Sequence, residues 1–294
     1  MNYQVILFYK YIAIEDPTAV ADTVRELALQ LDLIGRVIVA PEGINATLEG
    51  TEERTASFIE AFLSDERFSD IDIKRSFGGG TTFPKLSVKV RSEIVGTHLK
   101  KEDADPTVRT GKRLSADELH AWYQNKEDFV VVDMRNDYEY ASGHFENSVD
   151  PGMRACRDLP KVLPALTGLQ NKTVVTVCTG GVRCEKMSAY LVGKGFKDVY
   201  QLDGGIHTYM QKYPTGAFKG ALYTFDQRVI MDFTKERGVI GRCRLCGVQT
   251  EEYVNCANTE CHLHFLACTA CRVPKGTTCS SACTALLESK SALV

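Results

Sequence analysis

The segment of this sequence best suited to do chemistry is a cysteine that precedes two glycines and an arginine. Cys178 directly follows the apolar run 173–177. It begins a six-residue loop that consists of Cys178, Thr179, Gly180, Gly181, Val182 and Arg183. A cysteine between a buried strand and the next helix faces backbone N–H groups, which favour its thiolate. The glycines let these amides converge, and Arg183 adds a charge able to bind an oxyanion. The pattern therefore predicts a reactive thiolate at Cys178 rather than an inert buried cysteine.

Three further residues are candidates for supporting roles around this loop. Asp133 ends a second apolar run, 129–133, and we expect it to form a buried pair with Arg135 that braces the floor of the loop. Cys184 lies one residue past the loop. It either packs in the first helical turn or resolves an oxidised Cys178. A disulfide requires Cα atoms within about 7 Å, so the sequence leaves both roles open.

The last part of the chain holds eight cysteines in four closely spaced pairs. They are Cys243 and Cys246, Cys256 and Cys261, Cys268 and Cys271, and Cys279 and Cys283. Such spacing brings two thiolates to one metal ion, and two pairs complete a tetrahedral zinc site. Two structural zinc sites are therefore expected, with the pairing of the ligands left open. His262 or His264 could replace a cysteine, and disulfides or free thiols are the alternative.

Composition and charge narrow the class of protein. The chain has 294 residues, of which 44% are hydrophobic and 25% charged, as is usual for globular proteins with two or three domains. Its net charge of −3 argues against indiscriminate binding to nucleic acid, and we expect no DNA partner. No apolar run approaches the roughly 20 residues that span a bilayer. The first residues are typical of a strand and not of a signal peptide, which predicts a cytoplasmic protein without a membrane partner.

One stretch of the chain is basic although the net charge of the whole chain is negative. Residues 74–113 contain ten lysines and arginines and four acidic residues, which gives a local net charge of +6. A solvated surface is one explanation, and a surface that contacts phosphates is the other. Lys85, Lys89 and Arg91 alternate along a predicted strand, so their side chains share one face. They are the candidates for phosphate contacts.

The first hundred residues alternate between strand and helix patterns. Strands are predicted over 4–11, 36–40, 45–48, 71–76 and 86–95, and helices over 17–31 and 51–63. The order strand–helix–strand–strand–helix–strand is that of a ferredoxin-like domain, the split βαβ fold. We therefore expect such a domain over residues 1–100.

A second α/β unit follows a linker over 101–113. Ser115 and Glu118 form a capping-box pattern at the start of a helix. Strands are predicted over 129–133, 173–177 and 198–202, and a helix over 186–193 that ends at Gly195. Alternating strands and helices indicate a parallel sheet covered on both faces. This domain is expected over residues 114–215, and the cysteine-rich C-terminal region over 216–294.

Several segments of this second unit resemble rhodanese domains. The residues 131–140 and 142–145 resemble a rhodanese strand and its following turn, and 203–206 resembles a late rhodanese turn. The loop that begins at Cys178 has the six-residue length of the rhodanese active loop. Asn136 departs from the pattern, because many rhodaneses have glutamate there. Rhodaneses carry sulfur as a cysteine persulfide, so the resemblance implies a sulfurtransferase as one possible activity.

A more specific resemblance extends over essentially the whole chain. The segments 40–47, 83–95 and 178–186, together with the cysteine-rich tail, are similar to the TrhO family of tRNA uridine hydroxylases. The resemblance implies an oxidoreductase that converts the wobble uridine (U34) of tRNA to 5-hydroxyuridine. Molecular oxygen would be the co-substrate, the anticodon loop of tRNA the partner, and Cys178 the active-site residue. A sulfurtransferase with a Cys178 persulfide, or a non-catalytic zinc adaptor, is the alternative.

Overall fold

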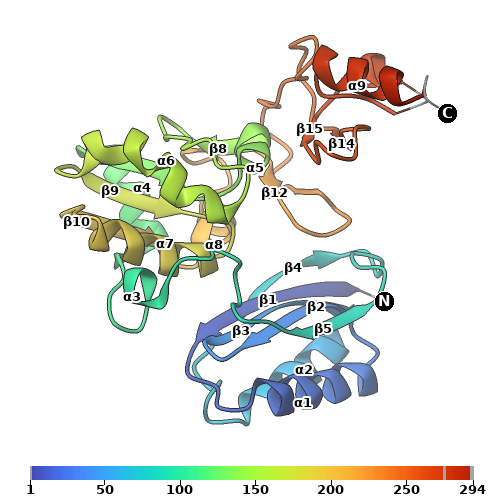
Figure 1. The fold of residues 1–294 in the computed structure, drawn as a ribbon. Coiled ribbons are helices and arrows are strands. Elements are labelled where there is room, and N and C mark those ends of the chain that lie inside the picture. Colours follow the sequence, from blue (N-terminus) through green and yellow to red (C-terminus); the bar gives the residue numbers. More distant parts are fainter. Residues whose placement is uncertain (1, 274–275, 292–294) are drawn as a thin grey trace.

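The computed structural model describes residues 2–273 and 276–291. Figure 1 shows two α/β units that follow one another along the chain and a smaller unit at its C-terminal end. The predicted N-terminal domain and C-terminal region include a few residues that lie outside the described ones, namely Met1, residues 274–275 and residues 292–294. Among the described residues, no helix combines the length and the apolar character needed to cross a bilayer.

The N-terminal unit is built on one five-stranded sheet with the order β4-β1-β3-β2-β5. Its elements are β1 (Tyr3–Tyr11), α1 (Pro17–Gln30), β2 (Ile34–Ala40), β3 (Gly43–Thr51), α2 (Glu52–Leu63), β4 (Lys74–Gly78) and β5 (Leu86–Val90). The pairs β1–β3, β1–β4 and β2–β3 are antiparallel, as the ferredoxin-like prediction requires. The last strand, β5, pairs in parallel with β2 and extends the sheet at that edge.

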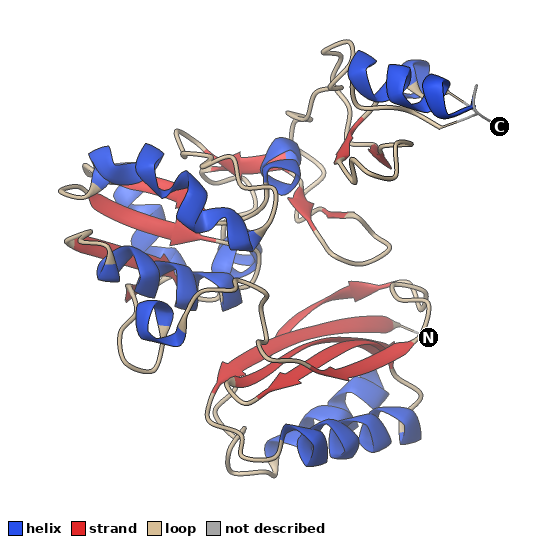
Figure 2. Cartoon of the chain, in the orientation of Figure 1, coloured by secondary structure: helices blue, strands red, loops and turns tan. Residues whose placement is uncertain are grey.

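Both helices of this unit cover the same face of the sheet, as Figure 2 shows. Asp16 caps α1 through its side chain, and Thr51 caps α2. Phe8 and Phe58 are among the large side chains buried between the helices and the sheet. The opposite face has no helix on it and lies toward the second unit. This open face forms one wall of the candidate site.

The second unit contains a four-stranded parallel sheet with the order β6-β10-β9-β7. Its elements are β6 (Lys112–Leu114), α4 (Ala116–Asn125), β7 (Val130–Asp133), α5 (Asp137–Ser142), β8 (Gly143–Phe145), α6 (Leu159–Leu166), β9 (Thr173–Val177), α7 (Val182–Gly193), β10 (Asp198–Leu202) and α8 (Gly205–Lys212). Buried side chains of α4 and α8 pack on one face, and those of α6 and α7 pack on the other. The predicted capping box of Ser115 and Glu118 is present.

Two boundaries differ from the sequence-based expectation. The predicted linker 101–113 holds a short helix, α3 (Lys101–Ala104), and most of β6, which joins the parallel sheet beside β10. A three-residue strand is too short to show an alternating pattern. The helix α7 begins at Val182 and not at Lys186. The last two residues of the cysteine loop, Val182 and Arg183, therefore belong to the first helical turn.

The described C-terminal part consists of short strands, a single 3-10 turn over Thr269–Cys271 and one α-helix. Its strands are β11 (Phe218–Gly220), β12 (Leu222–Tyr223), β13 (Ile230–Met231), β14 (Tyr253–Asn255) and β15 (His264–Leu266), and α9 (Ser281–Ser291) follows. The first of these, β11, pairs with β8 of the second unit. Between β12 and β13, the loop 224–229 reaches toward β4 of the N-terminal unit (Figure 1). Gln227 N donates a hydrogen bond to the Thr82 carbonyl oxygen, at 2.9 Å.

Candidate active site

The Cys178 thiol lies where β9 ends and α7 begins. The Gly181 N–H donates to its Sγ at 3.2 Å, and Gly181 adopts a φ of +104°, which favours glycine. The predicted late turn packs directly beneath the loop. A Cβ atom at Gly205 would lie 2.6 Å from the Cys178 carbonyl oxygen, so only glycine fits there. The backbone of the loop is thereby fixed around the sulfur.

The environment of this thiol favours its ionised form. Burial opposes ionisation of Cys178, but a hydrogen bond from the Cys184 thiol, the charge of Arg183 and backbone amides of both residues outweigh it. Together they lower the pKa of Cys178 from 9.0 to about 6. Burial and the neighbouring Cys178 raise the pKa of Cys184 well above its ordinary value. The two opposite shifts therefore favour a thiolate at Cys178 and a protonated thiol at Cys184.

Arg183 has a partner that was not anticipated from the sequence. Its guanidinium makes a bidentate ion pair with Glu139, with N–O distances of 2.6 and 2.8 Å, and it also donates to the Thr179 hydroxyl. Both side chains of the ion pair are buried. The guanidinium therefore joins α5 to the thiol loop. If Arg183 binds an oxyanion, as the sequence predicts, its guanidinium must interact with the oxyanion and with Glu139 at the same time.

Asp133 and Arg135 form the expected buried pair, but they brace a different element. The Arg135 side chain donates to both Asp133 carboxylate oxygens, and its Nη2 also donates to the Gly143 carbonyl oxygen. The pair thus fixes the turn between β7 and β8. Within this unit, Glu139 rather than this pair forms the side-chain hydrogen bonds to the loop residues Thr179 and Arg183.

The N-terminal sheet packs directly on the thiol loop. Tyr11 Oη donates to the Val182 carbonyl oxygen at 3.1 Å. A Cβ atom at Gly180 would lie 2.9 Å from Leu7, and one at Gly181 would lie 2.6 Å from the Tyr9 hydroxyl. The two glycines therefore allow the sheet to approach, in addition to shaping the loop.

A cavity of about 380 Å³ separates the loop from the rest of the sheet. One wall is the open face of the N-terminal sheet, including Arg36 and Asn45. The loop residues Thr179, Gly180, Val182 and Arg183 form a second wall. The third comes from the loop 224–229, in which Arg228 donates to the Phe77 carbonyl oxygen of β4 at 2.9 Å. This volume is within the usual range of small-molecule sites.

The predicted basic strand lies on the same face as this cavity. Leu86 and Val88 of β5 pack against the helix-covered core, so alternate residues point to the open face. Lys89 is one of these residues, and Lys85 and Arg91 continue the alternation directly before and after β5; all three side chains are exposed. In register, Lys89 lies beside Ile38, which lines the cavity. Most other cations of the stretch 74–113 have carboxylate partners, whereas these three form no ion pair within the described part of the chain.

The eight predicted metal ligands gather into two groups of four. One holds Cys243, Cys246, Cys268 and Cys271, and the other holds Cys256, Cys261, Cys279 and Cys283. Within each group, all sulfur atoms lie within 4.8 Å of one another. Three of the Sγ–Sγ separations are 3.6 to 3.7 Å, close to the ~3.8 Å edge of a tetrahedron with Zn–S bonds of about 2.3 Å. Either group can hold a metal such as zinc. His264 belongs to neither, and its ring stacks on Tyr253.

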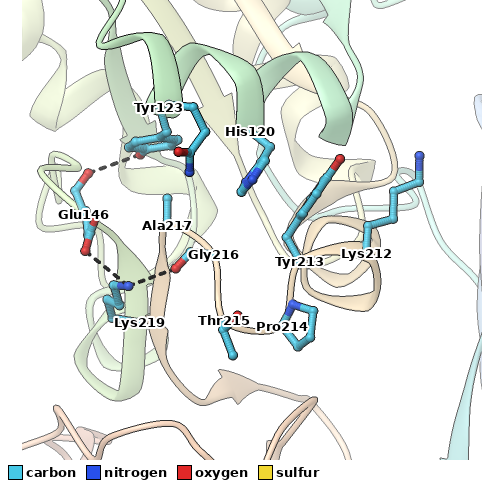
Figure 3. Close-up of a pocket in the computed structure, with 11 residues that line it drawn as sticks. His120, Tyr123, Glu146, Lys212, Tyr213, Pro214, Thr215, Gly216, Ala217 and Lys219 are labelled. Carbon is cyan, nitrogen blue, oxygen red and sulfur yellow. Dashed lines mark hydrogen bonds and ion pairs between the residues drawn. The ribbon is translucent and has the colours of Figure 1, made fainter.

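A second pocket, of about 450 Å³, lies between α4 and residues 212–219 (Figure 3). No residue of the thiol loop lines it. Its lysines are paired within the pocket or beside it, Lys219 with Glu146 and Lys212 with Asp117. The ring of His120 stacks on Tyr213 at 3.8 Å. Both lysines of this pocket are therefore neutralised by carboxylates, and the cavity at the thiol loop is the better candidate site.

Three known protein families match the three parts of the chain, one family for each part. A family described as the UPF0176 acylphosphatase like domain matches residues 3–94, and the rhodanese-like domain family matches residues 115–212. A family described as rhodanase C-terminal matches residues 219–284. A solved rhodanese-like domain protein from Staphylococcus aureus is 30% identical, covers 33% of this chain and 90% of its own, and has a TM-score of 0.29.

Curated relatives match over nearly the full length. Proteins named tRNA uridine(34) hydroxylase from Cytophaga hutchinsonii and Staphylococcus haemolyticus are 41% and 43% identical to this chain. The alignments cover 96% and 90% of this chain, and 90% and 84% of the relatives. Identity at this level over this share of both sequences shows that the chain belongs to the family of tRNA uridine(34) hydroxylases.

Proposed function

We propose that this protein hydroxylates the wobble uridine of tRNA at C5, with molecular oxygen as co-substrate and Cys178 as the essential thiol. The observation that supports this most directly is the cavity, which four residues of the thiol loop line opposite the open sheet of the N-terminal unit, while Cys178 itself is fully buried beside them in the loop. A wobble uridine lies in a single-stranded loop, so its extrusion into a cavity costs little. One oxygen atom enters the base, and the other leaves as water with two electrons and two protons from a thiol reductant.

The anticodon loop is proposed to bind across the N-terminal sheet. Lys85, Lys89 and Arg91 point to the face that leads into the cavity, and Arg36 lines the cavity itself. Unpaired cations along one edge suit the phosphates that flank an extruded base. Such an arrangement fits a macromolecular substrate better than thiosulfate. A sulfurtransferase with a Cys178 persulfide is the less supported alternative, because the full-length relatives carry the name of the hydroxylase.

Replacement of the thiol tests the reaction. We expect Cys178→Ser to abolish 5-hydroxyuridine formation, because a serine hydroxyl is far less ionised than this thiol. Mass spectrometry of tRNA nucleosides, from cells that depend on either form of the protein, measures the modification. The matched control is Cys156→Ser, whose thiol lies beside the same cavity but outside the loop. Normal levels of 5-hydroxyuridine with the Cys178 variant would contradict the assignment.

Removal of the cationic strand tests the tRNA surface. Alanine at Lys85, Lys89 and Arg91 is expected to weaken tRNA binding and to reduce the slope of log affinity against log salt by about 2, at roughly 0.7 per phosphate contact. The reaction of Cys178 with thiosulfate should be unchanged.

The control for this variant removes the same amount of charge elsewhere. Lys126, Lys172 and Lys197 are exposed and precede β7, β9 and β10, at the edge of the parallel sheet opposite the thiol loop. Lys126 has a positive φ and is changed to asparagine, which tolerates that conformation, and the other two to alanine. If both triple variants lost affinity equally, net charge and not this surface would explain the effect.

A further inference from the structure

Two buried polar atoms that lack hydrogen-bond partners belong to residues that line the cavity. They are Oδ1 of Asn136 and Nδ1 of His207. Both residues are buried: Asn136 is 7% exposed and His207 is 4% exposed. An unsatisfied buried polar group costs about 1–3 kcal/mol, so such groups in residues that line a cavity favour a ligand that supplies the missing partner.

The chemical character of the two atoms restricts that ligand. The Asn136 Nδ2 donates to the Tyr138 hydroxyl at 2.7 Å, which leaves Oδ1 as an acceptor in need of a donor. Burial lowers the pKa of His207 to about 4, and Lys74 and Arg228 act in the same direction. The imidazole is therefore neutral at physiological pH and offers one N–H donor and one acceptor nitrogen.

A partly exposed aromatic ring lines the same cavity. Phe225 lies on the loop 224–229, lines the cavity and is 49% exposed. The Arg183 guanidinium lies 5.5 Å from its ring centroid, and Tyr223 supports the ring by an edge contact. Half-exposed aromatic rings of this kind are the usual platforms on which proteins stack unpaired bases.

We propose that the cavity is a uracil-recognition pocket in which the base stacks on Phe225 and hydrogen-bonds to Asn136 and His207. Uracil presents one N–H, at N3, between two carbonyl oxygens. Its N3–H satisfies Asn136 Oδ1, and one carbonyl accepts from the His207 ring. Cytosine presents an acceptor at N3 and would oppose Asn136 with a like partial charge. This inference rests on the proposed function, since it assumes that an RNA base enters the cavity.

Binding of synthetic anticodon stem-loops by the full-length protein tests the stacking role. The wild type should bind a stem-loop with uridine at the wobble position on the order of tenfold more tightly than one with an abasic site there. Phe225→Ala should lower the affinity for uridine toward the abasic level and leave the abasic affinity unchanged, whereas Phe225→Tyr should retain the preference. Phe77→Ala is the control, because Phe77 is 87% exposed but does not line this cavity.

A 3-methyluridine stem-loop tests the hydrogen bond to Asn136. The wild type should bind it several-fold less tightly than uridine, and Asn136→Ala should bind the two about equally. His207→Phe, which removes both ring nitrogens, should weaken uridine binding and spare abasic binding. Equal wild-type affinity for uridine, 3-methyluridine and the abasic site would overturn the proposal, whether or not the variants fold. Absence of any stem-loop binding would instead contradict the proposed function itself.

Discussion

At the scale of single residues, the reactivity of Cys178 depends on contacts that are close in sequence. The amide that donates to its Sγ, the thiol of Cys184 and the charge of Arg183 all lie within six residues. This is why the sequence could predict the thiolate. Glu139, which holds Arg183, and Tyr9, which contacts Gly181, come from distant segments. No local pattern identifies such contacts, because they exist only once the units are packed.

The ionisation of Cys178 should be directly visible. A pKa lowered to about 6 means that the thiolate is present at neutral pH and is lost as the pH falls through that value. The thiolate absorbance of the wild type minus that of Cys178→Ser, measured against pH, should therefore have its midpoint near 6 and not near 9. Subtraction removes the signal of the other cysteines except Cys184, whose pKa depends on Cys178. A midpoint that stays near 9 would show that burial outweighs the hydrogen bonds and the charge of Arg183.

At the scale of elements, the residue patterns within short segments predicted most helices and strands, but they did not predict how distant segments combine. The four cysteine pairs were evident from their spacing. Their combination was not, since the first pair joins the third and the second joins the fourth. The same holds for β5, whose place beside β2 at the sheet edge depends on the whole topology. Its position matters for function, because it brings the cationic residues onto the face that borders the cavity.

Metal content follows from the two cysteine groups. Purified, reduced protein should contain about two zinc ions per chain, since each group supplies four thiolates. Cys246→Ser should remove about one ion from the first group, and Cys283→Ser should remove about one ion from the second group. Elemental analysis measures the loss, and limited proteolysis should show faster cleavage of the C-terminal region in both variants because zinc supplies its folding energy. Cys156→Ser should retain both ions. Zinc-free protein with an intact C-terminal region would rule out this role for the metal.

At the scale of the whole molecule, the candidate site exists only because the units dock. The thiol loop, the open sheet and the loop 224–229 each form one wall of the cavity. Lys186 of α7 is central to this docking. Its Nζ lies 2.7 Å from Glu42 and 2.9 Å from Glu93, both of which belong to the N-terminal unit. The sequence placed Lys186 in a family motif, but it could not show that the residue joins two domains.

Loss of the Lys186 charge should loosen the docked arrangement. The side chain is 6% exposed, so Lys186→Met would leave two partly buried carboxylates without their cation, at a cost of about 3 kcal/mol. We expect faster tryptic cleavage after Lys100, Lys101 and Arg109, in the segment that joins the two units. We also expect weaker binding of the uridine stem-loop, because two walls of the cavity separate. Lys186→Arg retains the charge and should show a much smaller effect on both measurements. Unchanged cleavage and binding in Lys186→Met would mean that Tyr9, Tyr11 and the loop 224–229 hold the units together without this ion pair.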